Sequence, residues 1–491
     1  MSLVPKNRSA VPPTGEVCAV AALALLALAA PLPLAAQSFD DLSPSTREFV
    51  SVSSPAVALV GVTVIDGTGA DARTDQTIVL RDGRIEAVGA SADVAIPDDA
   101  EVHELPGHTV IPGMVGMHDH LFYSGGGRDA QLSFSAPRLY LGAGVTTIRT
   151  TGSQSPYSDL SLKDAVDGGQ VPGPRIEITA PYITGPSQGV TDMAVVDNAE
   201  EARRFVEYWA DEGATWIKAY TNISRESLGA AIEAAHARGL KVTGHLCSVT
   251  YREAVDLGID NIEHGFLTAT DFIEGKEPDG CPPNSMIATG AQGDPTSERA
   301  QALMRHMVDN GVGMTSTLAV IEPFIPERKV MEERTLELMS PEIRESYEQT
   351  RNMIETNPNW PFTNAMFEKA LAFEKAFVDA GGTLAGGVDP TGTGGVIHGF
   401  GDQRNYELLV EAGLTPAQAV EAMSLNGARI LEKDGDLGSV EAGKAADLVV
   451  LEGDLAADAS VIRAVRIVFK NGVGYDPSKL IESTKGRVGV S

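Results

Sequence analysis

The middle of the chain alternates short apolar runs with amphipathic segments, a pattern typical of parallel strands joined by crossover helices. Helical periodicity over 200–212 and 225–238 ends at Gly213 and Gly239, and Thr415 to Gln418 predicts a capping box with proline in the first turn. The predicted strands are 109–117, 145–150, 175–180, 215–219, 241–244, 260–263, 312–316 and 383–388. The predicted fold class is therefore α/β, with a (β/α)8 TIM barrel over 114–435. A doubly wound sheet is the alternative, but no dinucleotide fingerprint follows the first strand.

The two ends of the chain have a different sequence pattern. Between 57 and 112, and again over 446–451 and 462–471, β-rich runs alternate with turn signals and show no helical period. We predict that segments 37–113 and 436–491 together form a composite β-sandwich domain. An insertion over 268–299, rich in Gly and Pro, predicts a lid or rim loop after the sixth strand.

Residues 1–36 have the pattern of an export signal: basic residues precede an apolar run, and small residues at Ala35 and Ala36 precede Gln37. We expect cleavage near Ala36 and an exported, periplasmic or secreted protein. Pro31 and Pro33 inside the run make a retained membrane helix the less favoured interpretation. An untargeted leader is a further alternative.

Charge and cysteine content narrow the partners. With 38 Lys and Arg against 67 Asp and Glu, the formal charge of −29 argues against nucleic acid or an anionic membrane surface and leaves a small-molecule substrate, with a homo-oligomer possible. Beyond the leader only Cys247 and Cys281 remain. Two buried thiols are the favoured interpretation, and one disulfide in an oxidising compartment is the alternative. Any metal must then be held by His and carboxylates.

Four of the nine histidines fall at the ends of predicted strands. His118 and His120 are two apart in one strand, so both side chains point to the same side. His245 and His264 end the strands KVTG and NIE. A single histidine in a strand is often a hydrogen-bonded core residue, but four at the rim from which barrel enzymes take their catalytic groups indicate metal ligands.

Lys218 and Asp389 complete this group of candidates. Lys218 lies inside the apolar run TWIKAY, where burial of an unpaired ammonium is costly, and Asp389 ends the strand TLAGGVD. A helix N-cap role for Asp389, or a salt bridge between the two, is the structural alternative. We predict catalytic roles for both.

The motifs PGMVGMHDHLF, WIKAY, GLKVTGHL, NIEHG and AGGVD, in this order and spacing, resemble the metal-dependent amidohydrolase superfamily, dinuclear carboxylated-lysine type. The resemblance is closest to imidazolonepropionase-like and prolidase-like exported members. It implies that His118, His120 and Asp389 bind one divalent ion, His245 and His264 bind a second, and a carbamate on Lys218 bridges both together with a hydroxide. Zinc is the first choice of metal. Two divalent cations in one pocket also favour a carbamate over a charged ammonium at Lys218.

The expected reaction is attack of the bridging hydroxide on an amide-type C–N bond in a small substrate, a dipeptide or N-acyl amino acid, with Asp389 moving the proton to the leaving nitrogen. Alternatives are a heterocycle deaminase, a lactone or phosphoester hydrolase on the same site, and a non-catalytic binding protein. Rim side chains that could contact substrate, or be plain loop surface, are Tyr123, Arg128, Tyr182, Tyr220, His398 and Gln188.

Overall fold

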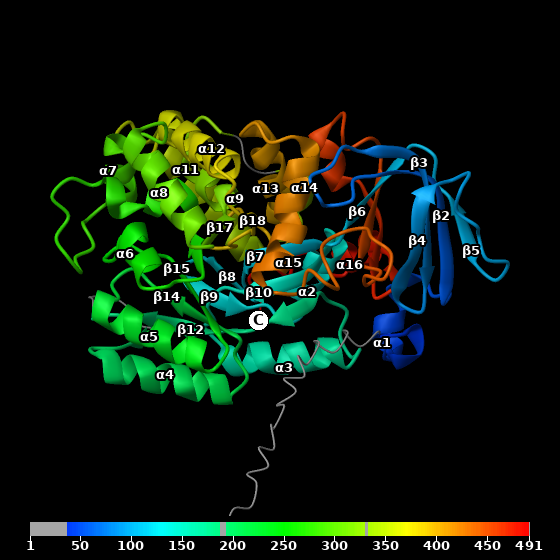
Figure 1. Cartoon of the computed structure of the whole chain (residues 1–491), viewed down its shortest axis with the longest axis horizontal. Coiled ribbons are helices and arrows are strands. Elements are labelled where there is room, and N and C mark those ends of the chain that lie inside the picture. Colours follow the sequence, from blue (N-terminus) through cyan, green and yellow to red (C-terminus); the bar gives the residue numbers. More distant parts are fainter. Residues whose placement is uncertain (1–36, 187–192, 329–331, 491) are drawn as a thin grey trace, which may run out of the picture. The chain divides into compact units, whose positions relative to one another are not determined.

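The computed structural model describes residues 37–186, 193–328 and 332–490, and the predicted signal peptide 1–36 and Gln188 lie outside them. The two ends of the chain contribute strands to one nine-stranded sheet in the order β1-β21-β20-β19-β6-β2-β3-β4, with β5 also paired to β2. In Figure 1 the blue N-terminal strands and red C-terminal segments lie together accordingly. The N-terminal members are β1 (Val50–Val52), β2 (Ala56–Val64), β3 (Arg73–Arg81), β4 (Arg84–Ala90), β5 (Glu101–Glu104) and β6 (His108–Pro112); the C-terminal ones are β19 (Leu448–Glu452), β20 (Val465–Lys470) and β21 (Val473–Tyr475).

This sheet is the unit that both ends were expected to build together. Register pairs Leu448 with Pro112 and Glu452 with His108, so β19 and β6 are adjacent although far apart in sequence. Val57, Leu59 and Leu448 belong to a separate buried apolar cluster beneath it. Its description as a sandwich stays a prediction.

The middle of the chain forms two parallel sheets. One is β11-β10-β7 and the other is β13-β12-β14-β15-β16-β17-β18. The first contains β7 (Met114–Asp119), β10 (Val145–Thr150) and β11 (Arg175–Glu177). The second contains β12 (Thr179–Thr184), β13 (Ala194–Val195), β14 (Trp216–Ala219), β15 (Lys241–Gly244), β16 (Asn261–Glu263), β17 (Gly313–Ser316) and β18 (Leu384–Gly386).

The two parallel sheets contact each other at two places. Thr179 N donates to Thr150 Oγ1 at 3.0 Å, and Asp389 N donates to His118 O at 2.8 Å. At the second contact the two backbones lie so close that a Cβ on Gly387 would be only 2.3 Å from His118 N. The end of β18 therefore lies directly against the end of β7, which contains the predicted ligand His118 and is followed at once by His120.

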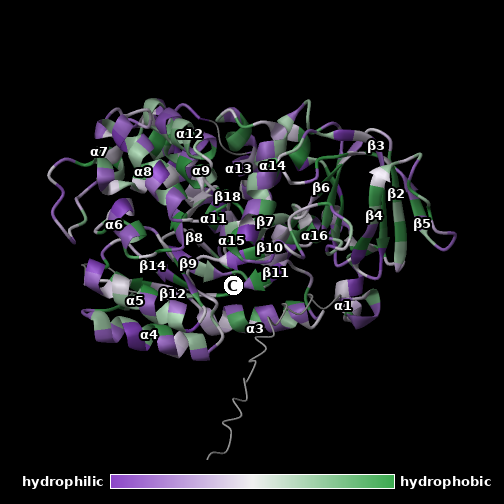
Figure 2. Ribbon diagram, viewed as in Figure 1, coloured by the Kyte–Doolittle hydropathy of each residue, from purple (hydrophilic) through white to green (hydrophobic). Residues whose placement is uncertain are grey.

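Helices follow the strands and turn their polar sides outward, as the purple outer faces in Figure 2 show. They include α2 (Ser135–Gly142), α3 (Pro156–Asp167), α4 (Ala199–Asp211), α5 (Arg225–Ala237), α6 (Tyr251–Asp256), α8 (Glu298–Asp309), α12 (Asn364–Asp379), α13 (Phe400–Glu411), α14 (Pro416–Met423) and α15 (Leu425–Ile430). The capping box at Thr415 and Gln418 is confirmed. Among the described residues no helix has both the length and the apolar character needed to cross a bilayer.

Three sequence-based expectations need correction. The single strand expected over 109–117 is two strands in different sheets, because the first strand ends at Pro112 and the second begins after Gly113. At Gly113 the backbone lies so close to Thr146 that a Cβ would be 2.1 Å from Thr146 Oγ1. The run 175–180 likewise divides into β11 and β12. The insertion after β16 contains a helix, α7 (Ser285–Gln292), and is not loop throughout.

The favoured interpretation of two free thiols is wrong. Cys247 and Cys281 form a disulfide with a Cα–Cα distance of 5.0 Å. Cys247 lies two residues after His245, and Cys281 lies in the insertion ahead of α7. The cross-link therefore ties a ligand-bearing loop to the insertion.

Candidate metal centre

Strand β7 places the histidine pair. All six of its residues, His118 among them, are buried; His120 directly follows the end of the strand, and the ring centroids of the two histidines are 5.4 Å apart. Their Nε2 atoms lie 3.6 and 3.3 Å from the two carboxylate oxygens of Asp389, which follows β18. The first predicted ligand set, His118, His120 and Asp389, is thus brought together at the seam between β7 and β18.

The other two imidazoles come from adjacent parallel strands. His245 follows β15 and His264 follows β16, and their ring centroids are 4.3 Å apart. The ring of His264 is also 4.5 Å from that of His118, and its Nδ1 lies 3.7 Å from Asp389 Oδ2. His264 has a left-handed backbone conformation with φ 71°, which residues other than Gly rarely adopt. This geometry turns its ring toward the other imidazoles.

Lys218 lies on β14, in register with Tyr182 of β12 and Thr243 of β15. Its side chain is 1% exposed, and Nζ has no hydrogen-bond partner among the residues that the structure describes. Nζ does not form an ion pair with Asp389, which was the structural alternative for both residues. Burial lowers the pKa of Lys218 to about 8, so the neutral amine is accessible near neutral pH.

The protonation states suit a cation. Burial lowers the pKa of His118 to about 4 and that of His245 to about 3, and it lowers the pKa of His264 well below its usual value. Burial acts to raise the pKa of Asp389, but the surrounding imidazoles outweigh it and hold that pKa well below the ordinary range. Neutral imidazoles beside an ionised carboxylate are the forms in which these groups bind metal.

Ligand atoms of His118, His264 and Asp389 all lie within 4.8 Å of one another, and the three side chains are buried. Because a buried lysine without a partner and neutral imidazoles surround the same carboxylate, the residues fit a divalent metal centre.

A buried glutamate that sequence reasoning missed orients His118. Glu263 Oε2 accepts a hydrogen bond from His118 Nδ1 at 2.7 Å, which leaves Nε2 free for a metal. Its other oxygen accepts from Asn261 at 3.0 Å and pairs with the fully buried Arg149. Glu263 and Asn261 are two residues apart on β16. Period-two spacing could therefore have predicted that both side chains lie on the same face of the parallel sheet.

Two further imidazoles are oriented in the same way. His120 Nδ1 lies 3.2 Å from the carbonyl oxygen of Gly152, and His264 Nδ1 lies 2.8 Å from Thr317 Oγ1. These contacts fix the ring positions, and in His120 they leave Nε2 on the side of Asp389.

The predicted ligands line a cavity of about 280 Å³. Of the candidate substrate contacts, Tyr182 and Tyr220 line it, with rings 5.3 Å apart. Burial raises the pKa of Tyr182 well above its usual value and that of Tyr220 to about 12, so both keep their hydroxyl protons.

The other three candidates lie outside this lining. Tyr123 is buried, and its hydroxyl accepts from Gly395 N at 2.9 Å. His398 is fully buried and donates to Phe122 O at 3.1 Å. Arg128 is 49% exposed and pairs with Glu342 at 3.1 Å. These residues shape or flank the loops, and no described contact places them in the cavity.

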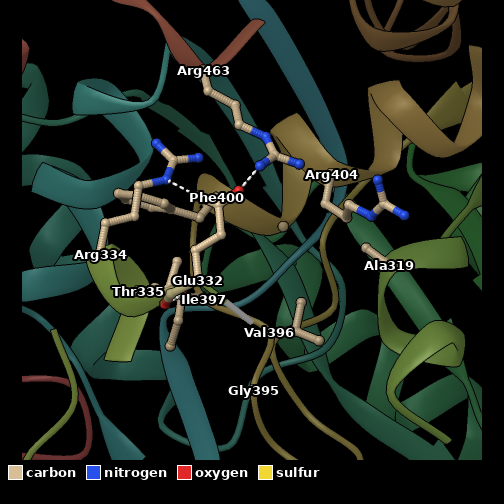
Figure 3. Close-up of a pocket in the computed structure, with 11 residues that line it drawn as sticks. Ala319, Glu332, Arg334, Thr335, Gly395, Val396, Ile397, Phe400, Arg404 and Arg463 are labelled. Carbon is tan, nitrogen blue, oxygen red and sulfur yellow. Dashed lines mark hydrogen bonds and ion pairs between the residues drawn. The ribbon is translucent and has the colours of Figure 1, made fainter. Parts of the chain in front are cut away.

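A second pocket, here called the arginine pocket, is lined by Arg334, Arg404 and Arg463 (Figure 3). Arg334 Nε lies 2.6 Å from Glu332, Arg463 pairs with Glu332 and Glu407, and Arg404 lies 2.7 Å from Glu322 and from Glu407. Each guanidinium is thus neutralised by a carboxylate of the chain, and the pocket is a structural ion-pair network.

Residues 109–474 match the model of the amidohydrolase family, and the chain belongs to this family. This places it among metal-dependent hydrolases that act on carbon–nitrogen bonds and have a barrel-type fold with an additional domain.

More particular likenesses come from single proteins. The chain is 39% identical to an imidazolonepropionase of Nocardia farcinica over 80 residues, which is 16% of this chain and only 20% of that relative. A solved structure of a putative prolidase from Bifidobacterium longum is 25% identical, with a TM-score of 0.63 over 88% of this chain and 99% of that one. A Xaa-Pro dipeptidase structure with bound methionine (21% identical, TM-score 0.62, 86% and 100% covered) and phenylurea hydrolase B (20%, 0.62, 89% and 100%) share the fold.

Proposed function

We propose that this protein hydrolyses an amide-type C–N bond in a small substrate of the dipeptide or N-acyl amino acid class. The observation that carries the proposal is the convergence of four imidazoles, one carboxylate and a buried lysine without a partner in one cavity. The solved prolidase and dipeptidase structures of the same fold support the choice of substrate class.

In this proposal two divalent ions, zinc as the first choice, are held at the mouth of a closed (β/α)8 barrel. His118, His120 and Asp389 would hold one ion, His245 and His264 would hold the other, and Lys218, as a carbamate, would supply a further anionic ligand. The carbamate is supported by the lowered pKa of Lys218 and by charge, because an ammonium beside two divalent cations would be strongly repelled. A neutral amine is also the form that can take up carbon dioxide.

Bound at this site, the ions would acidify water and polarise a carbonyl. The residues of the chain carry the remaining tasks. Asp389, ionised at neutral pH, accepts the proton of the attacking water and returns it to the departing nitrogen. Tyr182 and Tyr220 offer neutral hydroxyl donors on one wall, which suits orientation of a substrate carbonyl.

The test is metal analysis of the purified protein followed by a substrate screen. We expect close to two divalent ions per chain, loss of activity on chelation and its return on adding zinc. The screen contains dipeptides, N-acyl amino acids, lactones and phosphotriesters. Protein that never holds more than trace metal, or metal-loaded protein that cleaves only the lactones or phosphotriesters, would contradict the proposal.

We further propose export with removal of residues 1–36. The Cys247–Cys281 disulfide supports this, because such bonds persist in oxidising compartments and are rare in a reducing cytosol. N-terminal sequencing of secreted protein should begin at or near Gln37, and an N-terminus that retains Met1 would contradict the proposal.

A further inference from the structure

In the part of the chain that the structure describes, the outer region of the metal cavity has no side chain that could neutralise a substrate carboxylate. Beyond the predicted ligands and Lys218, the described lining consists of neutral polar side chains and apolar ones. The apolar ones are Phe122, Met193, Met286, Val320, Ile321 and Phe324. Among the described residues, therefore, no guanidinium and no second ammonium faces the substrate space.

Basic side chains on the neighbouring segments are held elsewhere. Arg128 pairs with Glu342, and Arg149 pairs with Glu263 on the far side of the ligands. Arg328 is bound by Glu322 at 2.6 Å and Glu411 at 2.7 Å. Of the two internal segments that are not described, 187–192 contains no Lys or Arg by sequence and 329–331 contains Lys329.

The apolar wall comes from two separate segments. Val320 and Ile321 lie on α9 (Leu318–Ile321), which follows β17, and Phe324 ends the next turn, η4 (Glu322–Phe324). Phe324 stacks on Phe362 with centroids 5.0 Å apart, which holds that side of the wall. Met286 lies on α7 of the insertion, and its flexible thioether can adapt to an aromatic or branched group.

An anionic group that packs against this wall, away from the predicted metal ligands, loses water and meets no opposite charge among the described residues, which is unfavourable. The net charge of −29 adds a long-range repulsion of anions. An uncharged apolar group meets neither cost and gains from burial against Phe324 and Met286.

We propose that the cavity selects uncharged apolar amides: within the proposed class, derivatives whose carboxyl group is blocked as an amide or arylamide, in preference to the free acids. This inference rests on the proposed function for the reaction, but the preference for neutral ligands is a property of the cavity itself.

The test uses a matched pair, N-benzoyl-L-leucinamide and N-benzoyl-L-leucine, which differ only in the charge of the terminal group. Binding of each is measured by calorimetry on the metal-loaded Asp389→Asn variant, and kcat/KM for release of benzoate is measured on the wild type. We expect the amide to bind at least tenfold tighter and to be cleaved at least tenfold more efficiently.

Met286→Arg adds a guanidinium to the wall, and Met286→Gln is its neutral control. Met286→Arg should reduce the amide preference about tenfold, whereas Met286→Gln should keep it. Equal or tighter binding of the free acid by the Asp389→Asn protein would overturn the inference. If the uncharged amide binds more tightly but wild-type enzyme cleaves neither compound, the inference is upheld and the proposed function is contradicted.

Discussion

The arginine pocket and the metal cavity both concentrate ionisable side chains, but they differ in what compensates the charge. In the arginine pocket Arg334, Arg404 and Arg463 each lie against glutamates of the same chain. In the metal cavity burial lowers the pKa of His118, His245 and His264 and so favours their neutral forms, and Lys218 is buried with no partner among the described residues. A cluster whose charged groups are paired within the chain stabilises the fold. A buried cluster with unpaired ionisable groups is typical of a site that a ligand or metal completes.

The largest effect is expected from Lys218→Met, compared with Lys470→Met. Both lysines are buried, and burial lowers the pKa of Lys470 to about 7, but Lys470 Nζ donates to Gly173 O, ahead of β11, at 2.8 Å. Lys218→Met should abolish activity and lower the bound metal, because the variant cannot form the proposed carbamate. Lys470→Met should retain both. Metal analysis and kcat measure this, and a fully active, metal-loaded Lys218→Met protein would reverse the contrast.

Next in size is Asp389→Asn, which keeps the shape of the side chain but removes its ability to accept a proton at neutral pH. Loss of a general acid–base group lowers turnover by about 10²–10⁴-fold. We expect most of the metal to remain, so kcat falls while metal content changes little. Asp159→Asn, a buried aspartate that accepts from Ser153 and Gln131, is the control and should keep turnover near the wild-type value. Wild-type kcat in Asp389→Asn would exclude the proton-transfer role.

Glu263→Gln is expected to weaken metal binding, but less than Lys218→Met does. The change removes the charge that orients His118 and leaves Arg149 buried without a counter-charge. Metal affinity should fall about 10–100-fold, and the free energy of unfolding should fall by about 3–5 kcal/mol. Chelator competition and thermal unfolding measure the two quantities.

Glu322→Gln is the matched control for this prediction. Glu322 is also 1% exposed and pairs with Arg328 and Arg404, but it contacts no predicted ligand. It should lower stability and leave metal affinity unchanged. Equal metal affinity in Glu263→Gln and wild type would show that Glu263 has no orienting role.

The smallest effect is expected from Glu332→Gln in the arginine pocket. Glu332 is 43% exposed, and partly exposed ion pairs contribute about 1 kcal/mol or less. We expect a shift of this size in urea unfolding and unchanged metal content and turnover. A large loss of activity would mean that the two pockets are coupled, contrary to the comparison.

Much of this architecture could be predicted from local sequence pattern. Strands β10 and β15 have the bounds that the apolar runs predict, because two-residue and helical periods are local properties. The convergence of the strand-end histidines with Lys218 and Asp389 follows from the common direction of parallel strands, although the assignment of particular ligands to two ions stays a prediction.

What could not be predicted depends on contacts between distant segments. The Cys247–Cys281 bond joins residues 34 apart whose distance no local pattern fixes. The division of 109–117 depends on the close approach of Thr146 to Gly113. Tyr123 and His398 are withdrawn from the cavity by backbone partners on other loops, Gly395 and Phe122. Glu263 becomes recognisable only once Arg149 and His118 are seen on either side of it.

The disulfide also couples two properties that could otherwise change independently. One of its sulfurs belongs to the loop that presents His245, and the other to the insertion whose helix α7 brings Met286 to the substrate. A new insertion grafted from a relative to alter selectivity would thus also perturb the loop beside His245 unless it kept a cysteine in register with Cys247. Selectivity in this chain is best redesigned from the other segment of the apolar wall, at Val320 and Ile321 on α9, which the disulfide does not join to the loop of His245.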